Sequence, residues 1–135
     1  MAIIVHEASE SDVPRSCEVE IAAYGDNPTN AILFPGPFPP DSAQKRVDRL
    51  VGEINNDATI KLLKAVDEET GESIAFAKWH IFDTPEKAAA AEKALFFGPG
   101  TNQEACYEFF GGMAKRKKEI MGDKPHLCMS TIRRL

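Results

Sequence analysis

The side chains that could carry acid–base or covalent chemistry are few, and they are spread along the chain. Glu104 and Glu108 have the spacing that puts two carboxylates on one face of a helix, where they could share a proton or remain a solvated pair. His80 could titrate near neutrality, and a hydrogen-bonded, partly buried imidazole is the alternative. Cys128 lies in a predicted central strand, which favours an inert buried thiol over a nucleophile. These patterns identify no catalytic residue.

The cysteines and histidines do not have the spacing of a metal site. They include no Cys-x-x-Cys pair and are widely separated: Cys17, Cys106, Cys128, His6, His80 and His126. Zinc sites use ligands at short, regular spacings. An odd number of dispersed cysteines also suits free thiols in a reducing compartment. The sequence therefore predicts no metal and a cytoplasmic protein.

Length and charge narrow the class of protein further. A chain of 135 residues corresponds to one domain. Its net charge of −5 argues against general nucleic-acid affinity, because such affinity depends on neutralising phosphates. No apolar run approaches the roughly 20 residues that span a bilayer, and the N-terminus does not resemble a signal peptide. We expect neither nucleic acid nor a membrane as a partner.

Residues 59–82 predict a β-hairpin that organises the remaining elements. Two apolar arms flank the polar loop 67–72, in which Gly71 supplies the positive φ of the turn. Both faces of the second arm carry apolar side chains, so we expect this strand inside a sheet with helices on both faces. Trp79, on one of these faces, is either a core residue or a platform for a substrate.

Helices and two short strands are predicted on either side of the hairpin. Strands are expected at 2–7 and 126–132. The start signature at 9–12 precedes a helix whose predicted apolar face is Val13, Cys17, Ile21 and Tyr24. A second helix begins at Asp41 or Ser42, ends at 55–57 and has the stripe Val47, Leu50, Val51 and Ile54. An alanine-rich helix is expected from 83–86 to about Leu95, and a longer helix from about Asn102 to Met121.

Two stretches leave alternatives open. Residues 28–40 predict a proline-rich loop, either a surface crossover or a substrate-lining loop, since Phe34 and Phe38 are large apolar groups that need cover. The basic run 115–118 near the end of the longer helix is either a solvated helix end that complements the dipole or a phosphate-binding patch.

Several stretches, taken in order, resemble the N-terminal half of a GNAT-superfamily N-acetyltransferase of the kind common in filamentous fungi. They are Ala8-Ser-Glu-Ser-Asp-Val-Pro14, Leu33-Phe-Pro-Gly-Pro37, Val66-Asp-Glu-Glu-Thr-Gly71 with Ile74-Ala-Phe-Ala-Lys-Trp79, Asn102-Gln-Glu-Ala-Cys106 with Phe109-Phe-Gly-Gly112, and Met121-Gly-Asp-Lys-Pro-His-Leu127. The resemblance covers nearly the whole chain. It implies an α/β fold with a mostly antiparallel sheet of about four strands, helices on both faces, and acetyl transfer from acetyl-CoA to a small-molecule or peptide amine.

The resemblance also implies that residues 1–135 form one GNAT-like domain without its C-terminal acetyl-CoA-binding half. The family's Gln/Arg-x-x-Gly-x-Gly/Ala loop, which holds the pyrophosphate on backbone N–H groups, follows the strand at 126–132. Arg49-Leu-Val-Gly52 matches the start of this pattern, but it lies inside a predicted helix, where no N–H group is free.

The site residues implied by the resemblance lie on the acceptor side and on the last strand. Backbone groups of Met129, Ser130 and Thr131 would face the acetyl group, and the substrate-side candidates are Phe34, Phe38, Trp79 and His80. A different class of function is a non-catalytic or repurposed GNAT-derived module. Such a module would self-associate through the exposed strand 126–132, or bind a partner or small ligand on its open face.

Overall fold

The computed structural model describes residues 2–91 and 94–134, with side chains described as far as Met129. The chain divides into two compact units. Met1–Gly25, Asp41–Ile81 and Leu127–Leu135 form the first unit, and Asp26–Pro40 with Phe82–His126 form the second. The expectation of a single domain over residues 1–135 stays a prediction. Among the described residues, no helix is both long enough and apolar enough to cross a membrane.

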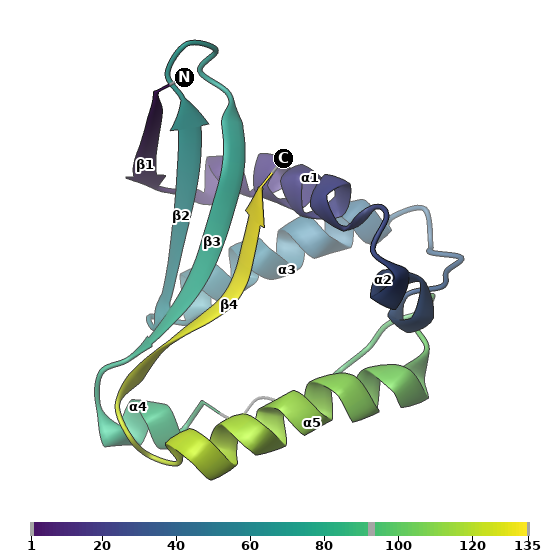
Figure 1. Ribbon diagram of the computed structural model, residues 1–135, viewed down its shortest axis with the longest axis vertical. Coiled ribbons are helices and arrows are strands. Elements are labelled where there is room, and N and C mark those ends of the chain that lie inside the picture. Colours follow the sequence, from purple (N-terminus) through teal and green to yellow (C-terminus); the bar gives the residue numbers. More distant parts are fainter. Residues whose placement is uncertain (1, 92–93, 135) are drawn as a thin grey trace. The chain divides into compact units, whose positions relative to one another are not determined.

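A four-stranded antiparallel sheet forms the base of the first unit (Figure 1). Its strands, in spatial order, are β1 (Ile3–Glu7), β2 (Ile60–Asp67), β3 (Ser73–Phe82) and β4 (His126–Arg134). Because β3 pairs with both β2 and β4, the predicted interior position of the second hairpin arm is confirmed, as is the α/β class with four antiparallel strands.

The predicted hairpin is formed by β2 and β3. Their pairing runs from Ile60 opposite His80 to Val66 opposite Ser73, with a bulge between Ala65 and Val66. Gly71 closes the turn at φ 73° and donates its N–H to the Asp67 carbonyl oxygen over 2.7 Å. Glycine adopts this φ without a steric penalty, which is why the turn forms here.

Two helices, α1 (Val13–Tyr24) and α3 (Ser42–Asn56), cover one face of this sheet (Figure 1). The buried core joins the helix to the strands through Val13, Cys17, Val19, Leu62 and Phe76. The predicted stripe of α3 packs against this core as expected, through Val47, Leu50, Val51 and Ile54. Helical periodicity thus identified the buried face of α3 correctly.

The predicted apolar face of α1 was wrong at one position. Ile21 is 53% exposed, whereas Val19 is 1% exposed. The face that meets the sheet includes Ser16, whose hydroxyl donates to the Asp12 carbonyl oxygen over 3.0 Å. This intrahelical bond satisfies the buried hydroxyl, so a polar residue occupies the inner face while Ile21 turns outward.

The second unit contains three helices: α2 (Pro28–Leu33), α4 (Pro85–Ala89) and α5 (Gln103–Met121). Because they belong to this separate unit, the expectation of helices on both faces of the sheet stays a prediction. The unit buries Leu33, Phe82, Ala88 and Cys106. The Cys106 thiol donates to the Leu33 carbonyl oxygen over 3.3 Å, and the Asn102 N–H donates to the same oxygen over 2.9 Å. These bonds tie α2 to the start of α5.

Helix α2 corrects the prediction that residues 28–40 are wholly loop. Pro28 is the first residue of the helix, a position where a missing N–H costs nothing. The Asn27 side chain caps the helix by accepting the Thr29 N–H over 2.9 Å. The remaining prolines begin only at Pro35, beyond the end of α2.

Helix α4 is much shorter than predicted, because it ends at Ala89 and not near Leu95. Its start was predicted correctly, since Thr84 caps it by accepting the Lys87 N–H over 3.2 Å. Ala88 is its buried residue. Alanine propensity without a large packed side chain does not sustain a longer helix.

The loop after α2 packs closely on the segment before α5. The Gly36 N–H donates to the Gly100 carbonyl oxygen over 2.9 Å. Gly100 has φ 87°, and a Cβ placed there would lie 2.6 Å from Cδ1 of Phe38. The Phe38 ring therefore occupies the space that any side chain at position 100 would need.

Candidate functional site

A groove of about 390 Å³ opens on the sheet face opposite α1 and α3. Every strand contributes to its lining, which consists of Glu7, Lys61, Leu63, Trp79, Ile81 and Leu127. Four of these side chains are apolar, and two carry charge. Pockets that bind small molecules are typically about 300–1,000 Å³, mostly apolar, with few polar groups. The groove is therefore the candidate ligand site of the first unit.

Strand register brings the walls of the groove together. Lys61 lies opposite Trp79 across β2 and β3, and Glu7 lies opposite Leu63 across β1 and β2. Side chains at alternate positions of a strand share a face. Leu63, Trp79 and Ile81 are half-buried, and Leu127 on β4 is 64% exposed. The groove is thus an open apolar surface framed by charged groups.

The polar rim of the groove is an ion pair between Lys61 Nζ and Glu7 Oε1, 2.8 Å apart. Both side chains are about half exposed or more, at 49% and 64%. Exposed pairs of this kind contribute roughly 0–1 kcal/mol, so a charged ligand can displace one partner at little cost. Sequence reasoning missed this pair: alternation places Lys61 beside Leu63, but its partner depends on how β1 pairs with β2.

Two predicted site residues that are adjacent in sequence lie on opposite faces of the sheet. Trp79 lines the groove and is half-buried. His80 is on the face covered by α1 and α3, where its Nδ1 lies 3.4 Å from Thr59 Oγ1. The structure therefore does not bring His80 to the groove, and a substrate role for either residue stays a prediction.

The predicted acetyl-facing residues Met129, Ser130 and Thr131 lie in β4. Met129 is 43% exposed, and alternation places it on the same side of β4 as Leu127. The side chains of Ser130 and Thr131 lie outside the described residues. The prediction concerns their backbone groups, and it stays a prediction.

Phe34 and Phe38 lie in the second unit, where both pack against their own surroundings. The Phe34 ring centroid is 6.3 Å from that of Phe110, which stacks on Phe97 at 5.5 Å. Phe38 is 51% exposed and lies over Gly100. Both residues have a structural role in this unit, and their part in lining a substrate site stays a prediction.

The other candidate groups do not form a catalytic constellation in the described part of the chain. Glu104 and Glu108 are both exposed on α5. Of the three free cysteines, Cys17 and Cys106 are buried and Cys128 is half-buried. Burial raises the pKa of both buried thiols. Across residues 2–91 and 94–134, no three His, Cys, Asp or Glu side chains gather into a possible metal site.

The basic run 115–118 has neighbours within its own unit. Lys117 Nζ lies 4.7 Å from the ring centroid of Phe82, a cation–π geometry. Arg116 pairs with Glu119 over 3.0 Å. These contacts suit a solvated helix end, the first of the two interpretations of this run.

Comparisons with solved structures relate this fold to known proteins. No protein-family model matches the chain, and no curated protein sequence matches it. A structure of histone acetyltransferase HPA2 and related acetyltransferase from Corynebacterium glutamicum matches with TM-score 0.50 and 19% identity, over 99% of this chain and 61% of that chain. The C-terminal condensation domain of Ebony, in complex with β-alanyl-dopamine, matches with TM-score 0.60 and 13% identity, over 89% and 51%.

The chain has a GNAT-like fold. It spans about half to three fifths of the length of these two structures. At such low identity the likeness concerns the GNAT-like fold alone. Activity, substrate and partners therefore have to be argued from the groove and the strands around it.

Proposed function

We propose that this chain belongs to a protein that transfers an acetyl group from acetyl-CoA to an amine. The observation that supports the proposal most is the likeness in fold to an acetyltransferase, which extends over 99% of the chain. The second support is the apolar groove, which provides a surface for an acceptor beside the strand expected to face the acetyl group.

The proposed reaction needs little from charged side chains. The amine nitrogen attacks the thioester carbonyl carbon, the C–S bond breaks, and coenzyme A leaves as a thiolate that takes a proton from water. A backbone N–H group among Met129, Ser130 and Thr131 would stabilise the negative charge that develops on the carbonyl oxygen. Water would take the proton from the amine, in keeping with a groove whose carboxylate, Glu7, is paired with Lys61.

In this proposal the acceptor amine packs against the side chain of Trp79. A half-buried tryptophan offers a large flat apolar face on which a substrate can lie. Leu63 and Ile81 extend that surface along β2 and β3. The groove thus favours an amine with an apolar body.

Calorimetric titration of acetyl-CoA into the purified chain tests the proposal. We expect saturable binding, and we expect Trp79→Ala to leave this cofactor affinity unchanged while it weakens the binding of an arylalkylamine by about tenfold, the cost of losing one aromatic contact. Ile21→Ala, which removes an exposed side chain on α1, is the matched control. Absence of any heat at millimolar acetyl-CoA would remove this proposal for the chain.

A second candidate function is self-association through β4. The supporting observation is that β4 ends the described strand order and carries Leu127 and Met129, 64% and 43% exposed. An edge strand with exposed apolar side chains is a template for pairing with another copy.

Light scattering coupled to size exclusion measures this association. We expect the apparent mass to rise with protein concentration, and Leu127→Glu to return it to that of the monomer, because a buried charge opposes the contact. Phe96→Glu changes another exposed apolar residue, 83% exposed and outside the sheet, and should have no effect. A wild-type mass that stays monomeric at all concentrations would rule this candidate out.

A further inference from the structure

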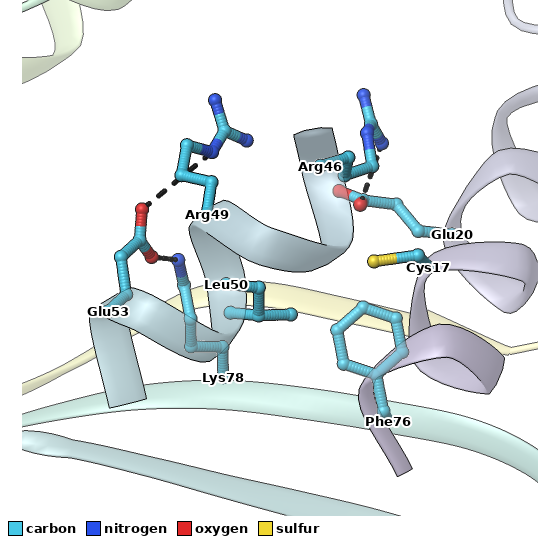
Figure 2. A pocket seen from close by; sticks show the side chains of 8 residues that line it. All are labelled: Cys17, Glu20, Arg46, Arg49, Leu50, Glu53, Phe76 and Lys78. Carbon is cyan, nitrogen blue, oxygen red and sulfur yellow. Dashed lines mark hydrogen bonds and ion pairs between the residues drawn. The ribbon is translucent and has the colours of Figure 1, made fainter. Parts of the chain in front are cut away.

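A second, smaller hollow of about 90 Å³ lies in the first unit on the helix-covered side of the sheet (Figure 2). Leu50 from α3 and Phe76 from β3 form its apolar floor, and the thiol of Cys17 lies beside them. Burial raises the pKa of the Cys17 thiol, so it is neutral at physiological pH and adds no negative charge.

The walls of the hollow carry more positive than negative charge. Arg46 pairs with Glu20 over 2.8 Å on one side. On the other side Glu53 pairs with Lys78 over 2.8 Å and with Arg49 over 3.9 Å. Three cations face two carboxylates, although the chain as a whole has a net charge of −5. The hollow is therefore a local positive region on an acidic protein.

The two arginines leave most of their hydrogen-bonding capacity to a ligand. They lie three residues apart on α3, and Figure 2 shows both guanidinium groups at the same rim of the hollow. Each guanidinium has five N–H donors. The Arg49 contact of 3.9 Å is beyond hydrogen-bond length, and this side chain is 69% exposed.

We propose that this hollow binds a small oxyanion, a phosphate or carboxylate group held between the guanidinium groups of Arg46 and Arg49. The planar donor fork of arginine matches both anions. The volume equals that of about three waters, which limits the ligand to a small group at this point. The inference is independent of acetyl transfer, because the site lies on the opposite side of the sheet from the groove.

Arg49-Leu-Val-Gly52 matches the start of a phosphate-loop pattern, but it cannot bind an anion through its backbone as such a loop does. These residues lie within α3, where the backbone N–H groups are used by the helix. Any anion bound here is therefore held by side chains, and substitution of the arginines removes the site without a change in backbone.

Titration with inorganic phosphate, followed through the arginine Nε–H resonances in NMR spectra, tests the proposal. Sodium acetate is titrated in parallel. Sodium chloride holds the ionic strength constant, because a change in screening alone would shift the resonances of exposed charged groups. We expect saturable shifts at Arg46 and Arg49. A stronger response to phosphate indicates a phosphorylated ligand, and an equal or stronger response to acetate indicates a carboxylate ligand.

Variants assign the response to the hollow. Arg49→Gln should weaken the affinity for phosphate by about tenfold, as expected for the loss of a charge-assisted hydrogen bond. Arg49→Lys should also weaken it, because lysine lacks the planar set of guanidinium N–H donors. Glu20→Gln should strengthen binding, since it releases Arg46. Arg116→Gln is the matched control, an exposed arginine paired with Glu119 in the second unit. Shifts that grow linearly without saturation, or that survive Arg49→Gln, would overturn the proposal.

Discussion

The two faces of the sheet in the first unit use similar residues in different ways. On the face covered by α1 and α3, Leu62 and Phe76 are 2% and 4% exposed. Two lysines on that face, Lys64 and Lys78, pair with Asp12 and Glu53 over 2.6 Å and 2.8 Å. On the other face Leu63 and Trp79 are half-buried, and Lys61 pairs with the exposed Glu7.

The difference shows that apolar composition alone does not identify the core face. Leu62 and Leu63 are neighbours on one strand, and each face carries both aliphatic and lysine side chains. The two faces differ because α1 and α3 cover only one of them, and on that face each of the two lysines lies beside a carboxylate. The open face keeps a groove because its apolar residues lack that cover within the first unit.

The largest effect on the free energy of unfolding should come from comparing two substitutions on β2. Leu62→Ala removes a fully enclosed side chain and should lower the free energy of unfolding by about 2–5 kcal/mol. Leu63→Ala removes a half-buried side chain and should lower it by about 1 kcal/mol. Urea unfolding of the two variants measures both values. Equal losses would mean that the open face is as well packed as the covered one.

A smaller effect should appear in the dependence of stability on pH. The hydrogen bond from Lys64 is the largest cause that lowers the pKa of Asp12 below its usual value. A carboxyl with a lowered pKa in the folded state stabilises the protein above its unfolded pKa, near 4, and this contribution is lost as pH falls through the lower folded value. Lys64→Met should therefore cost about 0.5–1 kcal/mol at neutral pH, with solvent screening included.

The same variant should flatten the loss of stability on acidification below about pH 4, because Asp12 would return toward its ordinary pKa. Urea midpoints measured from neutral pH down to pH 3 follow this change. Lys61→Met, on the open face, is the companion variant, and its more exposed pair should contribute a few tenths of a kcal/mol at most. If the Lys64→Met and Lys61→Met variants gave the same pH profile of stability, cover by the helices would not affect the contribution of an ion pair.

Local patterns were sufficient for elements whose packing agrees with their periodicity. The hairpin followed from two apolar arms around Gly71, and the buried stripe of α3 followed from its spacing. The prediction failed where capping or packing decided the outcome. Asn27 caps a short helix in a stretch that the prolines suggested was loop, and α4 ends early because its alanines provide little to bury.

The sequence predicted the two candidate sites less well than it predicted the fold. Alternation showed that Trp79 and His80 lie on opposite faces, but the sequence did not show which face would be covered. The pairs Glu7–Lys61 and Glu20–Arg46 join residues 54 and 26 positions apart. Pairs at such separations depend on strand register and helix packing, which no local pattern contains.

Gly100 couples two loops of the second unit in a way that restricts how this sequence can vary. Its φ of 87° strains any L-residue, and the Phe38 ring fills the space of a Cβ. Shortening Phe38 would remove the contact with its ring, but a Cβ at position 100 would still lie 2.9 Å from the Pro37 carbonyl oxygen and the positive φ would remain. Position 100 is therefore restricted to glycine both by its backbone conformation and by a backbone neighbour that no substitution at position 38 would move.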